Sequence, residues 1–149
     1  MEAPFAYFYD RSKQTNEEEA ITVDFNIELD FIKKYIKKEY RERIIFELQS
    51  KKKREKGFSH FSHSAQTVLN DSFIPCPMTQ LQDHLVALCS AQDECYMISG
   101  DTLDGHILPL HDAVEYCKAS HMAVILISSK FAVVKEEFEG GQPQVFISI

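Results

Sequence analysis

The chain has 149 residues and a mass of 17.2 kDa, 44% of its residues are apolar, and its formal net charge at pH 7 is -7. This length suits one domain with a buried core, and no apolar run approaches the roughly 18 to 20 residues that a membrane-spanning helix needs. The N-terminal stretch MEAPFAYFYD lacks the positive-then-apolar order of a signal peptide. We therefore expect a soluble, intracellular protein with a loose leader at residues 1–19 and a single domain at residues 20–149.

Cysteine spacing argues against a zinc ribbon and against a redox dithiol. The four cysteines, at positions 76, 89, 95 and 117, include no C-x-x-C pair. We expect reduced and mostly buried thiols, because free cysteine behaves as a small apolar residue.

Charge is distributed unevenly along the chain. Between Lys33 and Lys56 there are 11 basic and 4 acidic residues, a balance of +7, whereas the remainder carries 5 basic and 19 acidic residues. A basic block in an acidic chain is typical of a surface that contacts a phosphate backbone. A solvated helix face that neutralises a nearby acidic surface explains the charge equally well.

The first half of the chain predicts one strand and one clear helix. Residues 1–19 are polar and acidic, with a short strand at Phe5–Tyr9 that could dock on a partner or on a sheet edge of the same domain. AITVDF, residues 20–25, reads as a buried strand, and from Ile27 apolar residues recur at helical spacing. RERIIFELQSKKKREK, residues 41–56, fits either a strand followed by a helix or one continuous helix.

The second half alternates helices and strands after a Ser- and His-rich loop. Thr79 is a plausible N-cap for the helix LQDHLVALCSAQ, and the strand ECYMIS and an acidic turn follow. LPLHDAVEYCKAS predicts a helix, and AVILISS and PQVFISI predict strands. Continuous apolar strands that alternate with helices favour an α/β fold, a three-layer sandwich around a mainly parallel sheet.

Acidic residues fall at the ends of two of the predicted strands. Asp24 lies at the carboxyl end of the first strand, and Asp101 and Asp104 follow ECYMIS. If the two strands are adjacent and parallel, these side chains share the edge where α/β sheets bind ligands. Carboxylates gathered together repel one another, so a cluster usually implies a bound cation, and oxygen ligands favour Mg²⁺ or Mn²⁺.

The same residues resemble the PIN-like nuclease superfamily. ITVDFNIELDFI resembles its opening strand, and the segment from LQDHL to AVILIS, with its Ser-Gly-Asp, is similar to the later half of the NYN branch. In this resemblance Asp83 corresponds to the acid borne on a helix, Asp101 to the acid in the turn and Glu47 to the acid after an apolar strand. The resemblance spans about residues 20 to 129 and implies a PIN-like fold.

The resemblance implies a metal-dependent ribonuclease that cleaves single-stranded RNA. Asp24, Asp83 and Asp101 would bind Mg²⁺ or Mn²⁺, with Glu47 or Asp104 contributing directly or through water, and the metal would activate a water molecule. The residues expected to contact RNA are Asn26, Lys51, Lys52, Lys53 and Arg54. Such domains often work with protein partners in a larger RNA-processing complex.

Each acidic residue also has a purely structural explanation. Asp24 and Asn26 could cap the next helix, Asp83 could interact with a helix dipole, and Asp101–Gly105 could form a turn. A PIN-like module without catalysis, binding RNA or a protein, is therefore the second hypothesis. A third is a TIR-type signalling domain, which SGDTLDGHILPLHDAVEYCKASHMAVILISSKF resembles in rhythm.

Overall fold

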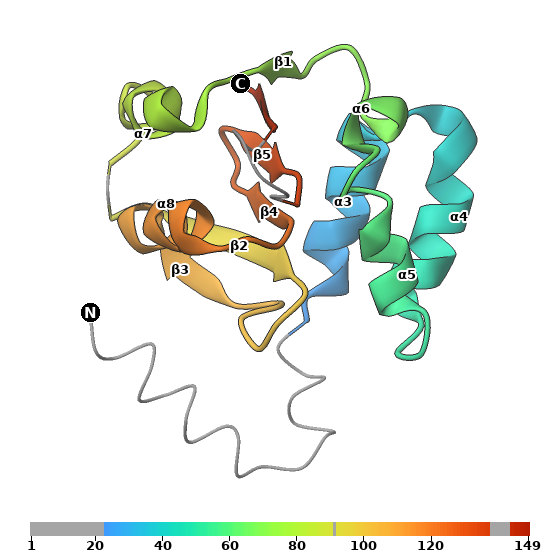
Figure 1. Ribbon diagram of the computed structural model, residues 1–149. Coiled ribbons are helices and arrows are strands. Elements are labelled where there is room, and N and C mark those ends of the chain that lie inside the picture. The colour runs from blue at the N-terminus through green and yellow to red at the C-terminus, as the bar shows by residue number, and fades with distance from the viewer. Residues whose placement is uncertain (1–22, 91, 138–143) are drawn as a thin grey trace, which may run out of the picture.

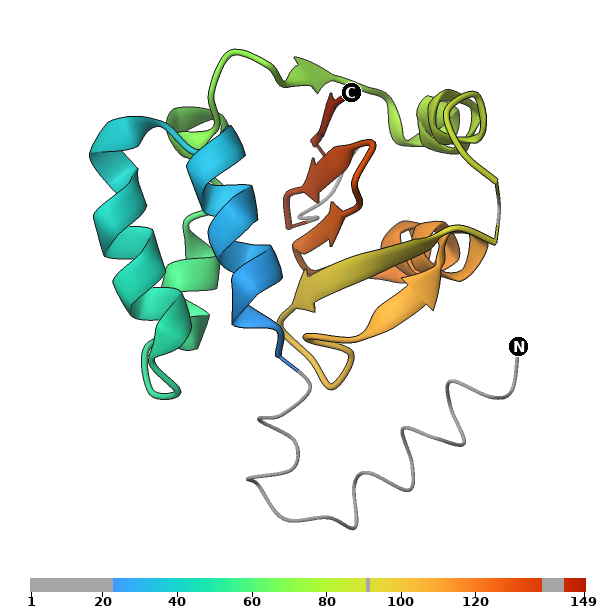
Figure 2. The same cartoon turned by 180° about the vertical axis from the view of Figure 1, so that it is seen from behind.

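The computed structural model describes residues 23–90, 92–137 and 144–149, so the predicted leader and residues 20–22 of the predicted first strand lie outside the described residues. Within these ranges six strands form one sheet in the order β1-β6-β5-β4-β2-β3. Helices α3 to α6 lie on one side of the sheet, and α7 and α8 lie on the other (Figures 1 and 2).

The elements have the following bounds. The helices are α3 (Phe25–Tyr35), α4 (Lys38–Gln49), α5 (Arg54–Ser59), α6 (Ala65–Val68), α7 (Met78–Val86) and α8 (Leu110–Ala119). The strands are β1 (Ile74–Pro75), β2 (Glu94–Ser99), β3 (Ile107–Pro109), β4 (Val124–Ile127), β5 (Ala132–Lys135) and β6 (Val145–Ser148).

Side-chain alternation along the strands divides the core into two parts. On β2, Tyr96 and Ile98 pack in the cluster under α3 to α6, whereas Cys95 and Met97 pack in the cluster under α7 and α8. Successive strand residues point to opposite faces, so covering both faces requires an apolar residue at nearly every position. This double coverage explains the continuous apolar strands in the sequence.

The prediction of a mainly parallel, PIN-like sheet is wrong, because every pair of neighbouring strands in the sheet is antiparallel. Two short strands of the sheet, β3 and β5, were not predicted from the sequence. β3 runs antiparallel to β2 and returns the chain to the end of the sheet where β2 began. After α8, β4 therefore starts from the opposite end and runs antiparallel to β2. Only four residues separate β4 from β5, a length that makes a hairpin and cannot make a parallel crossover.

Most of the other predicted elements are confirmed, with shifted ends. β2 and β6 form where ECYMIS and PQVFISI predict strands, and the basic block is helical throughout α4 and α5 with a turn between them. Phe25, predicted to end a strand, instead begins α3. Thr79 lies inside α7, whose N-cap is Pro77.

The four cysteines are free thiols, and three of them, Cys76, Cys95 and Cys117, are buried. None of the helices formed by the described residues combines the length and the apolar character that a membrane crossing would require.

Candidate functional site

A buried carboxylate, Glu28, organises the contact between α3 and the sheet. Its side chain is fully buried, and Tyr96 on β2 donates its hydroxyl to Oε2 at 2.6 Å. Arg54 at the start of α5 donates to both Glu28 oxygens, at 2.8 Å and 2.5 Å. Glu28 lies on the apolar stripe of α3, three residues before Phe31 and four before Ile32. An acidic residue on such a stripe is the sequence signal that could have identified Glu28 as a buried, paired carboxylate.

Arg54 joins this carboxylate to a second one. Its Nε and Nη2 donate to Asp104 at 2.7 Å and 3.0 Å, and its Nη1 also donates to the carbonyl oxygen of Leu48 at 3.1 Å. Burial by itself would lower the Arg54 pKa, but the hydrogen bonds and charges of Glu28 and Asp104 outweigh burial and raise that pKa further above its ordinary value. The counter-charge between these two carboxylates is therefore a guanidinium.

Asp101 and Asp104 shape the turn that follows β2. Oδ1 of Asp101 accepts the Ser99 hydroxyl at 2.7 Å and the Leu103 amide at 2.9 Å, and its Oδ2 accepts the Tyr116 hydroxyl from α8. Oδ1 of Asp104 also accepts the Ser99 amide at 3.1 Å. Both acids thus have turn-forming partners, as the structural explanation of Asp101–Gly105 expected.

Asp24 is the N-cap residue of α3. Its side chain accepts the amides of Asn26 and Ile27 at 3.1 Å and 3.3 Å, which satisfies donors left unpaired at the start of a helix. Its own amide donates to the Tyr96 hydroxyl at 2.9 Å. Asn26 is exposed in the first turn of α3.

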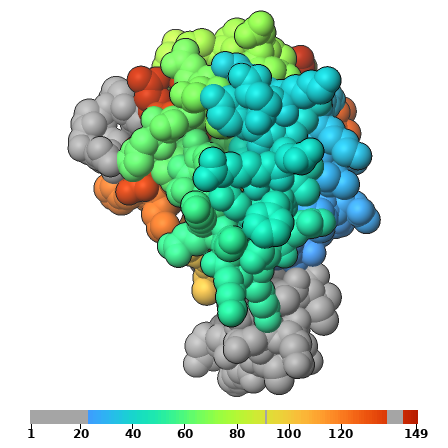
Figure 3. Space-filling model, turned by 90° about the vertical axis from the view of Figure 1, so that its right-hand side faces the viewer, coloured from blue at the N-terminus to red at the C-terminus, as the bar shows by residue number. Residues whose placement is uncertain are grey.

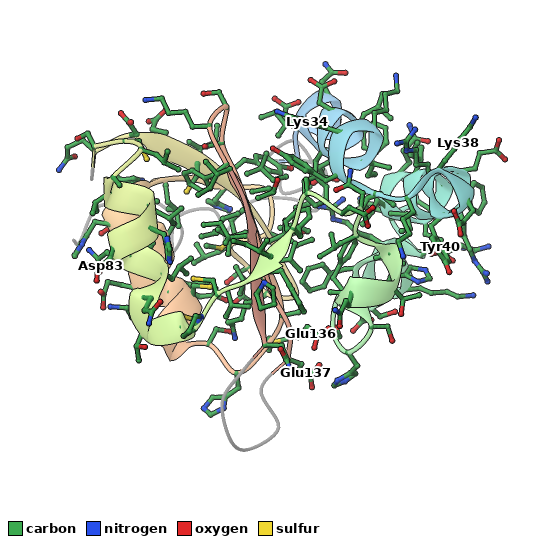
Figure 4. All side chains as sticks on the ribbon, turned by 90° about the horizontal axis from the view of Figure 1, so that it is seen from above. Lys34, Lys38, Tyr40, Asp83, Glu136 and Glu137 are labelled. Carbon is green, nitrogen blue, oxygen red and sulfur yellow. The ribbon has the colours of Figure 1, made fainter. Side chains whose placement is uncertain are left out.

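Glu47 and Asp83 lie away from this cluster. Glu47, on α4, has a side chain that is 4% exposed; it bonds His60 Nε2 at 2.8 Å and lies 3.6 Å and 3.9 Å from the basic groups of Arg43 and Lys56. Asp83 is exposed on α7. Figure 4 shows Asp83 on the opposite side of the sheet from Lys34 and Lys38.

The predicted carboxylates are therefore only partly brought together. Asp101 and Asp104 share the turn after β2, whereas the Asp24 carboxylate caps α3 and only the Asp24 backbone amide contacts Tyr96. Across the described ranges, no group of three or more His, Cys, Asp or Glu side chains has an arrangement that could hold a metal ion.

Lysines at the two ends of α4 form a separate basic surface. We call the residues Lys51, Lys52 and Lys53 the α4–α5 tip and the residues Lys33, Lys34, Lys37 and Lys38 the α3–α4 corner. All are exposed except Lys37, which is half-buried. In the part of the chain that the structure describes, none of these seven lysines pairs with a carboxylate, whereas Arg43, Arg54 and Lys56 do. Figure 3 shows the face that α4 and the turn into α5 form.

A cleft opens beside the α3–α4 corner. It has a volume of about 730 Å³ and lies between α3 and the adjoining ends of β2, β3 and β4. Phe31, Tyr96 and Ile127 contribute apolar surface, and Lys33, Lys34, Asp30 and Glu94 contribute charge of both signs. Its charges balance, so it offers no selectivity for an anion.

Comparison of the chain with models of protein families, with characterised proteins and with solved structures finds no match in any of the three. The resemblance to PIN-like nucleases thus stays a prediction from sequence, apart from the parallel sheet, which the strand pairing contradicts.

Proposed function

We propose that this protein binds RNA through the lysines at the two ends of α4. The observation that carries this proposal is the division of the basic block. Arg54, Arg43 and Lys56 neutralise carboxylates of the fold. The lysines of the α4–α5 tip and the α3–α4 corner, all exposed except the half-buried Lys37, have no acidic partner among the described residues. Unpaired lysines on one side of an acidic protein favour a polyanionic ligand.

The spacing of the two lysine groups suits an extended ligand. Because α4 has 12 residues, its ends are about 18 Å apart at 1.5 Å per residue. In duplex DNA the phosphates of one strand lie about 3.4 Å apart along the helix axis, and at that spacing roughly five phosphates span this distance. Glu39 and Glu42 are exposed on α4 between the two groups, which favours contact at the two ends over contact along the middle.

Metal-dependent cleavage of RNA is the second candidate function. It is supported by the sequence resemblance and by Asp101 and Asp104, which share the turn after β2. There Mg²⁺ or Mn²⁺ would have to compete with the hydrogen bonds of both carboxylates. RNA binding by the lysines requires no metal ion. The lysine side chains would also not have to give up hydrogen bonds within the described part of the fold in order to bind RNA. An intracellular location and protein partners in RNA processing would accompany either function.

The test is RNA binding measured by fluorescence anisotropy over a range of salt concentrations. Lys51→Gln/Lys52→Gln is compared with Lys118→Gln/Lys130→Gln, which removes the same charge from α8 and the β4–β5 turn. We expect the first pair to lower the affinity and to reduce the slope of log K against log salt by about 1.4, because each phosphate contact on a single strand contributes about 0.7. The second pair should bind like the wild type. Equal losses for the two pairs, or no binding at 50 mM salt, would contradict the proposal.

A further inference from the structure

Phe46 is a large apolar side chain placed in water beside the α4–α5 tip. It lies on the outer side of α4 and is 59% exposed. The other large apolar side chains that are exposed in the described part of the chain, Ile74, Val86, Ile107, Met122 and Ile149, are aliphatic or methionine. Phe46 is therefore the aromatic exception, and it lies on the surface that carries the unpaired lysines.

A lysine of the tip is in contact with this ring. The Lys53 ammonium lies 5.0 Å from the centroid of the Phe46 ring, within the range of a cation–π interaction. The contact holds an exposed ring and an unpaired cation next to each other. A nucleotide has the complementary pair of groups, a planar base and a phosphate joined through a short sugar.

We propose that Phe46 is a stacking platform for an unpaired nucleobase, with Lys53 binding the adjacent phosphate; this inference rests on the proposed RNA-binding function. Every base has a π-face, so stacking on an aromatic side chain tolerates any sequence. In a duplex the bases stack on their neighbours and are not available to the ring. Phe46 thus makes the basic surface selective for single-stranded over double-stranded RNA, whereas the lysines alone recognise only phosphate charge.

The first experiment separates stacking from charge. Phe46→Leu removes the aromatic ring but keeps an apolar side chain, and Phe46→Tyr keeps the ring. The ligands are a 12-nucleotide RNA strand, the matched duplex and an abasic strand of the same length. We expect Phe46→Leu to weaken binding of the strand about 5- to 100-fold with an unchanged salt slope. Binding of the abasic strand should be unchanged by this substitution, and Phe46→Tyr should bind like the wild type.

The second experiment observes the stacked base directly. The chain has no tryptophan, so Phe46→Trp introduces a single indole as the reporter. We expect its fluorescence to be quenched by the RNA strand and not by the abasic strand. Absence of base-dependent quenching, together with wild-type affinity of Phe46→Leu for RNA, would overturn the inference. If Lys51→Gln/Lys52→Gln still weakens binding in that case, the proposed function stands without the stacking subsite; if no RNA binds, both fail.

Discussion

Arg54 and Glu28 form a two-point ion pair that fastens α5 to α3. The guanidinium Nη1 lies 2.8 Å from Oε1, and Nη2 lies 2.5 Å from Oε2. The Glu28 side chain is fully buried and the Arg54 side chain is 16% exposed, so water screens this pair only weakly. Parallel bonds of this kind fix the relative orientation of the two groups as well as their separation.

Breaking this pair from one side should destabilise the fold strongly. Glu28→Gln leaves the guanidinium partly uncompensated, and Arg54→Met leaves a buried carboxylate without its cation. We expect each variant to lose about 3 to 5 kcal/mol of unfolding free energy in urea. Glu42→Gln, at an exposed position on the neighbouring α4, is the control and should change stability by less than about 0.5 kcal/mol.

The double variant Glu28→Gln/Arg54→Met should lose clearly less than the sum of the two single variants, because removing both partners leaves neither charge unpaired. Additive losses would show that the two side chains do not interact in the folded protein.

Gly57 allows α5 to lie directly on α4. A Cβ at this position would lie 2.9 Å from Glu47 Cβ and 3.1 Å from the Leu48 amide nitrogen. We expect Gly57→Ala to lower the unfolding free energy by about 1 to 3 kcal/mol despite the better helix propensity of alanine. Gly100→Ala is the comparison, since its Cβ would meet the mobile end of Met122 and should be tolerated. Equal stability of the two variants would contradict the close packing at Gly57.

Substitutions at Asp24 distinguish a helix cap from a metal ligand. Asparagine caps helices about as well as aspartate, so Asp24→Asn should keep the wild-type urea midpoint, whereas Asp24→Ala should lose about 1 kcal/mol. If the second candidate function holds, RNA is cleaved with Mn²⁺ and both substitutions abolish cleavage. RNA cleavage that persists in Asp24→Asn, or that is indifferent to chelator, would remove Asp24 from any catalytic role.

The buried thiols predict lower stability in alkali. Burial raises the pKa of Cys95 and of Cys117 from 9.0 to about 12. Below pH 9 the folded and unfolded chains both keep these protons; between pH 9 and 12 only the unfolded chain releases them, so stability falls as the pH rises.

We expect a lower urea midpoint at pH 10.5 than at pH 8. The variant Cys95→Ala/Cys117→Ala should show a smaller decrease in the urea midpoint between pH 8 and pH 10.5. Tyr96 contributes to the decrease that remains, because burial also raises the pKa of its hydroxyl. The same decrease in the variant as in the wild type would exclude the two thiols as its cause.

Local sequence patterns predicted the elements with strong periodicity. The apolar stripe at Phe31, Ile32 and Tyr35 predicted α3, and ECYMIS predicted β2 with the observed bounds. The short strands β3 and β5 were missed because three or four residues carry too little pattern to separate a strand from a loop or a helix start. The direction of the later strands depends on β3 and β5, because each short antiparallel strand turns the chain around before the next element begins.

The residues of the candidate site also divide into those that local sequence predicts and those that depend on distant partners. Asp24 was recognised as a possible helix cap because that role depends on its immediate neighbours. Glu28 was overlooked, although an acid on an apolar helix stripe usually has a buried partner. Nothing local marks Arg54 as that partner, because the two residues are 26 positions apart.

By itself, the sequence determined the burial of the strands and the concentration of positive charge between Lys33 and Lys56. The tertiary structure alone decided which of those charges remain available. Arg54 follows Lys53 directly in the chain, yet Arg54 is neutralised by Glu28 and by Asp104, 50 positions away, while Lys53 stays at the surface beside Phe46. Charge compensation depends on proximity in space, and folding brings together carboxylates that no local pattern connects.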